Sequence, residues 1–109
     1  MKLAVVGSRS IEKYNLVDKI VCNVSEIITG GACGIDEVAK KYAVDNNIPL
    51  VEFLPEYNKY RRNAPLIRNS RIVDYADKVL IIWDGKSKGT QYVINKCIEK
   101  CKEYDLVII

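Results

Sequence analysis

Five short, nearly continuous apolar runs alternate in this chain with segments whose apolar residues recur at helical spacing. The runs are residues 3–6, 26–29, 50–54, 79–83 and 106–109. Continuous apolar runs are typical of strands covered on both faces, and helical connections between them favour parallel pairing. Right-handed crossovers leave few topologies. We therefore predict an α/β fold, a Rossmann-like three-layer sandwich with a five-stranded parallel sheet in the order 3-2-1-4-5.

Four segments carry the helical spacing. The first follows a capping Ser10, and its apolar stripe is Val17, Ile20, Val21 and Val24. The second covers residues 35–45, and its apolar side is Ile35, Val38, Ala39, Tyr42 and Ala43. The third begins at Asn63 and Pro65, and one face carries Leu66, Asn69, Val73 and Ala76. The fourth is capped by Thr90, and its inward residues are Val93, Ile94, Cys97, Ile98 and Cys101. Residues 55–63 are expected to form a polar loop.

Length and composition restrict the number of domains and the classes of function. The chain has 109 residues and a net charge of +3, which favours one domain over residues 1–109 and does not by itself imply nucleic acid. No apolar stretch reaches the ~20 residues that span a bilayer, and the first apolar run is too short for a signal peptide. We expect a cytoplasmic protein. The sequence has no histidine, and its four cysteines lack metal-ligand spacing, so no metal or cofactor is predicted.

Three of the predicted strands end in glycine-containing loops that open onto helical segments. The loops begin at Gly7, Gly30 and Gly85. In the order 3-2-1-4-5 they leave the sheet at one edge, beside the switch point where ligands of open α/β sheets bind. Unpaired amides and the helix dipole make such junctions suitable for phosphate. We therefore predict a ligand site at this edge.

Each loop offers particular groups. Arg9 can bind phosphate through its guanidinium, and small residues after strand two allow a ligand to approach the backbone. Arg68 and Asn69 lie on the third helix, and one or both of them are expected to point into the crevice. Trp83, at the end of strand four, either lines the site or fills the core. The predicted ligand-binding residues are Gly7, Ser8, Arg9, Gly30, Gly31, Ala32, Gly34, Asp36, Arg68, Asn69, Asp84, Gly85, Ser87, Gly89 and Thr90.

Several common site classes are excluded by their missing motifs. No G-x-G-x-x-G follows strand one, and the residue pair Thr29-Gly30 stands where a ribose-binding acid is expected for NAD. Gly85-Lys86-Ser87 lacks the upstream glycine of a P-loop, and no G-x-S-x-G elbow is present. An ordinary dehydrogenase, ATPase or α/β-hydrolase is therefore not expected.

The motifs together resemble the SLOG superfamily, which unites domains of the Smf/DNA-processing-protein-A and Lonely-Guy types. The likeness is strongest to its small stand-alone YspA-like branch. It rests on the strings Gly7-Ser8-Arg9, Thr29-Gly30-Gly31-Ala32-x-Gly34-Ile35-Asp36, Ala64-Pro65-Leu66-Ile67-Arg68-Asn69, Ala76-Asp77 and Trp83-Asp84-Gly85-x-Ser87-x-Gly89-Thr90. The resemblance implies a domain that binds a nucleotide or nucleotide-derived ligand. Lonely-Guy relatives cleave nucleoside monophosphates with a glutamate that follows the last string, whereas this chain has Gln91 there.

We therefore expect binding or sensing of a nucleotide-like small molecule, with phosphate on Arg9 or Arg68. One alternative is a hydrolase of N-glycosidic bonds with Asp36 or Asp84 as catalytic carboxylate. The other is single-stranded DNA binding through Tyr57, Tyr60 and the arginines nearby, and this partner is less favoured. No membrane contact is expected, and a homodimer that pairs through a helix face is the expected assembly.

Overall fold

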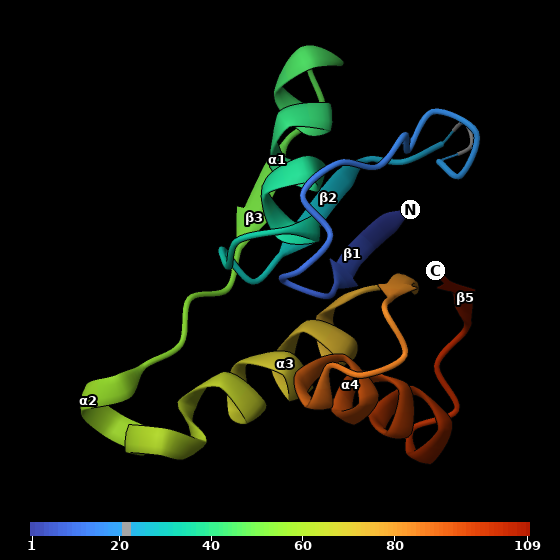
Figure 1. The fold of residues 1–109 in the computed structure, drawn as a ribbon. Helices are drawn as coiled ribbons and strands as arrows, with labels where there is room; N and C mark the ends of the chain where they lie inside the picture. The colour runs from blue at the N-terminus through green and yellow to red at the C-terminus, as the bar shows by residue number, and fades with distance from the viewer. Residues whose placement is uncertain (21–22) are drawn as a thin grey trace.

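The fold is that of a computed structural model, which describes residues 1–20 and 23–109 (Figure 1). Its strands are β1 (Lys2–Gly7), β2 (Glu26–Thr29), β3 (Leu50–Glu52), β4 (Lys78–Trp83) and β5 (Tyr104–Ile108). They form one sheet in the order β3-β2-β1-β4-β5, and every neighbouring pair is parallel. The predicted fold class and strand order are confirmed. β3 is shorter than expected, and β5 begins earlier than expected.

Helices cover both faces of the sheet. α1 (Ile35–Asp45) lies on one face, while α3 (Ala64–Tyr75) and α4 (Lys88–Glu99) pack side by side on the other (Figure 1). The side chains of β1 alternate between two cores: Leu3 and Val5 face α1, and Ala4 and Val6 face α3 and α4. Among the described helices, none has the length and apolar content that crossing a membrane requires.

The helix predicted after Ser10 is wrong for the described residues between β1 and β2, which form turns and segments without regular secondary structure. The side-chain oxygen of Asn15 accepts a hydrogen bond from the Val17 amide, and one turn follows in which the Ile20 amide bonds to the Leu16 carbonyl. Asparagine competes in this way with helix continuation. Leu16 and Ile20 are buried against the α1 side of the sheet, whereas Val17 is 63% exposed. Val21, also predicted to be buried, lies outside the described residues.

The segment between β3 and α3 contains two short helical elements instead of the predicted loop. They are α2 (Tyr57–Tyr60) and the 3₁₀ turn η1 (Arg61–Asn63). In Figure 1 this segment projects beyond the body of the domain. None of its residues is buried, so it contributes surface and not core.

The buried faces of α3 and α4 differ in part from the predicted ones. The buried residues of α3 are Ala64, Arg68, Ile72 and Val73. Leu66 is exposed and Asn69 is half-buried, because the inward stripe follows the i, i+4, i+8 row that begins at Ala64. In α4, the cap is Ser87 rather than Thr90: the Ser87 hydroxyl accepts from the Thr90 amide. Ile98 is exposed on the outer side of the last turn of α4, and Cys101 is exposed beyond Glu99, where α4 ends.

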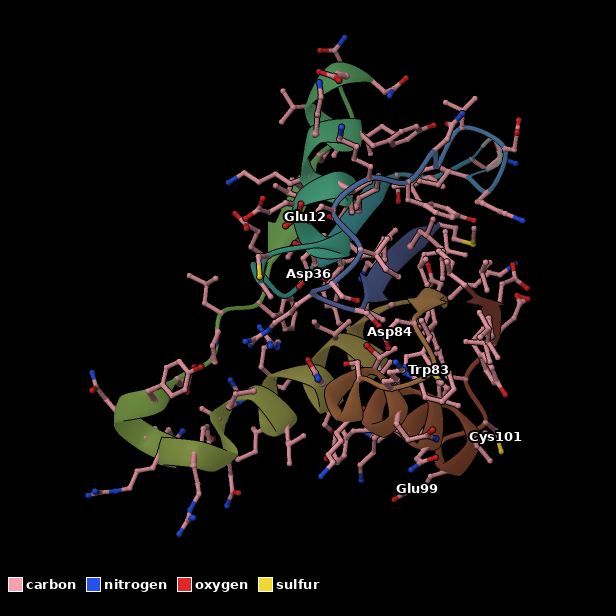
Figure 2. All side chains as sticks on the ribbon, viewed as in Figure 1. Glu12, Asp36, Trp83, Asp84, Glu99 and Cys101 are labelled. Atoms are coloured by element: carbon pink, nitrogen blue, oxygen red, sulfur yellow. The ribbon has the colours of Figure 1, made fainter. Side chains whose placement is uncertain are left out.

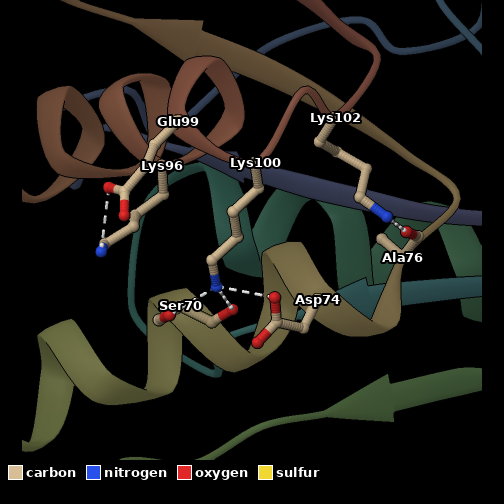
Figure 3. A network of polar contacts seen from close by, with 7 residues as sticks. All are labelled: Ser70, Asp74, Ala76, Lys96, Glu99, Lys100 and Lys102. Atoms are coloured by element: carbon tan, nitrogen blue, oxygen red, sulfur yellow. Dashed lines mark hydrogen bonds and ion pairs between the residues drawn. The ribbon is translucent and has the colours of Figure 1, made fainter.

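Polar contacts join the C-terminal part of α4 to α3 (Figure 3). The Lys100 ammonium donates to the Ser70 hydroxyl at 2.8 Å and to the Asp74 carboxylate at 2.6 Å. The Lys102 ammonium donates to the Ala76 carbonyl at the end of α3. A cation near the C-terminus of a helix is stabilising because of the helix dipole. These contacts hold the two helices together on their face of the sheet.

Candidate functional site

A cleft of about 400 Å³ opens where β1 and β4 end, at the predicted switch point. Ten of the predicted ligand-binding residues line it: Gly7, Arg9, Ala32, Asp36, Arg68, Asn69, Asp84, Ser87, Gly89 and Thr90. They come from the end of β1, from the loops after β1, β2 and β4, from the first turns of α1 and α4, and from α3. In Figure 2, Asp36 and Asp84 lie between α1 and the α3–α4 pair, where these loops meet.

The five remaining predicted residues do not line the cleft. Ser8, Gly30 and Gly34 are buried, Gly31 lines a separate hollow beside α1, and Gly85 lies on the outer side of its loop. Conversely, sequence analysis missed Val6, Ser10, Pro65, Leu66 and Val93, which also line the cleft. The apolar ones have the spacing of core or helix-start residues, which carries no sign of a ligand. Ser10 has the position of a helix cap in the sequence.

The loops after β1 and β4 are joined by hydrogen bonds. The Asp84 amide donates to the Ser8 hydroxyl at 3.0 Å, and the Ser10 hydroxyl donates to the Asp84 carboxylate at 2.7 Å. The Ser8 amide bonds to the carbonyl of Ile82 in β4. Ser8 is fully buried. It therefore holds the two loops together and is not a surface for a ligand.

Asp84 is a fixed anion in this junction. One carboxylate oxygen accepts from the amides of Lys86 and Ser87, each at 2.8 Å, and the other accepts from the Ser10 hydroxyl. The hydrogen bond from Ser10, followed by those from the two amides, lowers the pKa of Asp84 well below its ordinary value. The carboxylate thus stays ionised at neutral pH and shapes the loop before α4.

Asp36 has the opposite electrostatic character. It is 7% exposed in the first turn of α1, and its carboxylate accepts from the Ala32 amide at 3.1 Å. Burial raises the pKa of Asp36, and the Ala32 amide and the Arg68 guanidinium oppose this shift. A buried carboxyl with a raised pKa in a cleft is a candidate functional group.

The two arginines of the cleft are held differently. The buried Arg68 guanidinium donates to the carbonyls of Gly30 and Phe53 and, through Nε, to the Asn69 side-chain oxygen at 2.7 Å. It thereby ties α3 to the ends of β2 and β3. Arg9 is exposed at the cleft, and within the described residues its guanidinium makes no hydrogen bond or ion pair. Arg9 is therefore available to an anionic ligand.

The glycines differ in whether the surrounding atoms leave room for a side chain. A side chain at Gly7 would overlap the Ile82 carbonyl, and one at Gly34 would lie 2.5 Å from the Ser8 carbonyl. These two glycines allow the loops after β1 and β2 to pack together. At Gly89, an added Cβ would meet nothing within 4 Å. The backbone at the start of α4 is therefore accessible from the cleft.

Metal ligands are not gathered at this site: within the described ranges, no group of three or more His, Cys, Asp or Glu residues could hold an ion.

Comparison with known proteins assigns the family. A model of the DNA recombination-mediator protein A family matches residues 1–57, a little over half of the chain. The matched residues run from β1 to the start of α2, so they include the loops after β1 and β2 but neither Arg68 nor the loop before α4. Searches of the curated proteins and of the solved structures found no match. The resemblance to the SLOG superfamily is thus confirmed on its DNA-processing side: the chain belongs to the DNA recombination-mediator protein A family, which suggests a function related to DNA processing.

Proposed function

We propose that the cleft binds a nucleotide or a nucleotide-derived ligand, with its phosphate on Arg9 and on the open backbone at the start of α4. The observation that carries the proposal is the Arg9 guanidinium, which has no partner in the described part of the chain and lies in one cleft with the accessible Gly89 backbone. A guanidinium and helix N-terminal amides are the usual partners of phosphate in proteins. The Ser87 and Thr90 hydroxyls of the same wall add further polar contacts.

The rest of the cleft suits the less polar part of such a ligand. Val6, Pro65, Leu66 and Val93 give it an apolar wall. Binding clefts for small molecules are mostly apolar, with few polar groups that fix orientation, and their volumes are about 300–1,000 Å³. A cleft of about 400 Å³ falls within this range. We infer that the base or the ribose packs on this wall while the phosphate remains at Arg9.

Binding is better supported than hydrolysis. Within the described residues, both carboxylate oxygens of Asp84 already accept hydrogen bonds from its own loop and from Ser10, and its lowered pKa makes it a weak general base and leaves no proton to donate at neutral pH. Asp36 remains the one candidate for an N-glycosidic hydrolase, because burial raises its pKa. Release of free base from nucleoside monophosphates, abolished in Asp36→Asn, would support hydrolysis over binding alone.

The test of the proposal is nucleotide binding measured by calorimetry and by thermal shift. A nucleoside monophosphate is expected to raise the Tm in a concentration-dependent way, since a ligand that binds only the folded state stabilises it. Arg9→Gln should weaken binding by about tenfold or more, because hydrogen bonds between charged groups contribute about 1.5–3 kcal/mol. Arg62→Gln, which removes an equal charge from the exposed η1 turn, is the matched control and should bind normally. Equal losses in both variants would contradict the proposal.

A second candidate is single-stranded DNA binding, which the family assignment favours. The exposed segment of α2 and η1 carries Lys59, Arg61 and Arg62. The ring of Tyr60 lies 5.1 Å from the Lys59 ammonium and 5.6 Å from the Arg71 guanidinium. Affinity for an oligonucleotide that falls steeply with salt, and falls further in Arg62→Gln than in Arg9→Gln, would favour this function. The same pair of variants thus separates the two candidates.

A further inference from the structure

A second hollow lies on the other side of the loop before α4. This groove, of about 380 Å³, is lined by the side chains of Trp83, Lys86, Lys88, Gln91, Tyr92 and Asn95. No acidic residue lines it, and among the described residues the Lys86 and Lys88 side chains have no ion-pair partner. The groove is therefore an uncompensated cationic surface.

Two aromatic side chains line the groove. The Trp83 indole donates to the Ser87 carbonyl at 3.1 Å, which fixes the ring at the end of β4. Tyr92 is half-buried on α4, and the Lys96 ammonium lies 5.5 Å from the centre of its ring. Figure 2 shows Trp83 close to Asp84, at the base of the same loop. Aromatic faces beside unpaired lysines are suited to a nucleobase that carries a phosphate.

The groove and the cleft share one structural element. Ser87, Gly89 and Thr90 line the cleft, whereas Lys88 and Gln91 line the groove. The two hollows thus lie on different sides of the first turn of α4. A helix with its side chains is about 10–12 Å across. One extended ligand with two linked nucleotide units is long enough to contact both sides of this turn.

We propose that the groove is a second subsite, which holds the second unit of a ligand made of two nucleotides joined through phosphate. The inference rests on the proposed function of the cleft. Lys86 and Lys88 would contact phosphate, and the second base would stack on Trp83 or Tyr92. The linkage can be a pyrophosphate or a phosphodiester, since both present the same bases and charges to the two hollows.

Trp83 makes the subsite directly measurable, because it is the only tryptophan of the chain and it lines the groove and not the cleft. AMP, the phosphodiester pApA and the pyrophosphate-linked NAD are titrated in parallel. At least one dinucleotide is expected to bind about tenfold tighter than AMP and to quench Trp83 emission, since stacking contributes about 1–3 kcal/mol per base. Saturating AMP should leave the emission nearly unchanged. Which dinucleotide gains affinity identifies the linkage.

The double variant Lys86→Gln/Lys88→Gln should no longer bind a dinucleotide more tightly than AMP, and its affinity for AMP should equal that of the wild type. Lys13→Gln/Lys19→Gln removes the same charge from the exposed β1–β2 connection and is the matched control. If AMP binds and neither dinucleotide binds more tightly than AMP, the second subsite is refuted, while nucleotide binding in the cleft remains supported. If AMP quenches Trp83 as strongly as a dinucleotide does, the subsite is also refuted. If no nucleotide binds at all, the proposed function itself fails.

Discussion

At the scale of single residues, the two arginines of the cleft illustrate how the same side chain serves two purposes. Arg68 is 7% exposed and donates to the carbonyls of Gly30 and Phe53, the residues that directly follow β2 and β3. Burial lowers the pKa of Arg68, and Asp36 opposes that shift. Arg9 is exposed and has no such acceptor within the described chain. Arg68 therefore contributes to stability, whereas Arg9 is free to contribute to binding.

Replacing Arg68 with lysine tests this division. A lysine cannot reproduce the forked donors, so buried carbonyl groups lose their partners. We expect Arg68→Lys to lower the free energy of unfolding by about 1–3 kcal/mol, as measured by urea denaturation. Arg9→Gln should leave this free energy within about 0.5 kcal/mol of the wild type, as for most surface substitutions. A larger loss of unfolding free energy in Arg9→Gln than in Arg68→Lys would refute this division of roles.

The Asp84 carboxylate should make stability depend on pH in the acid range. Its folded-state pKa lies below its ordinary value, so its contribution is present above about pH 4 and is lost as the pH falls below it. We expect the Tm of Asp84→Asn to lie below that of the wild type at pH 6. This difference should shrink between pH 4 and pH 3. A Tm difference that stays constant across this range would show that the charge of Asp84 does not contribute to the stability difference.

Gly89 and Gly7 separate an open position from a packed one. Gly89→Ala should keep the unfolding free energy or raise it by up to about 1 kcal/mol, because the added methyl meets no atom and alanine favours helix. Its nucleotide affinity should fall, since the methyl occupies the wall of the cleft. Gly7→Ala should lose about 3 kcal/mol of stability through overlap with the Ile82 carbonyl. Unchanged affinity in a stable Gly89→Ala protein would place the ligand away from α4.

At the scale of elements, sequence patterns predicted helices well where the ends carried clear signals. α1 was predicted with its observed bounds, because Gly34 precedes it and Asn46-Asn47 follow it. The helix predicted after Ser10 does not form because the Asn15 side-chain oxygen accepts from the Val17 amide and the Ser10 hydroxyl donates to Asp84, a residue far away in the sequence. The cap of α4 shifted from Thr90 to Ser87 because both hydroxyls occur within one turn. Local patterns do not show which hydroxyl a distant carboxylate will engage.

The C-terminal end of α4 offers a test of helix termination. Cys101 follows the last helical turn with φ at 54°, and its amide bonds to the Ile98 carbonyl. Glycine is the preferred residue in this left-handed position. We expect Cys101→Gly to raise the free energy of unfolding by about 0.5–1 kcal/mol. Cys33→Gly, at an exposed cysteine without positive φ, should bring no such gain. Loss of stability in Cys101→Gly would contradict the assignment.

At the scale of the whole molecule, strand order determines where the site lies. The order β3-β2-β1-β4-β5 brings the loops after β1, β2 and β4 to one edge, and this could be predicted from alternation and crossover handedness. Which residue of each loop faces the cleft could not be predicted. Gly30 and Gly34 are enclosed by Arg68 and by the backbone of the first loop, and those contacts join segments distant in sequence. The sequence therefore predicted the sheet edge at which the candidate cleft opens, but five of the fifteen residues predicted to bind a ligand do not line that cleft.

The most direct test of nucleotide binding in the cleft is a crystal structure of the chain with a nucleoside monophosphate. We expect the phosphate to lie within hydrogen-bond distance of the Arg9 guanidinium and the Gly89 amide, with the base or ribose against Leu66 and Val93. A phosphate bound instead to the exposed α2–η1 segment, with the cleft empty, would contradict it.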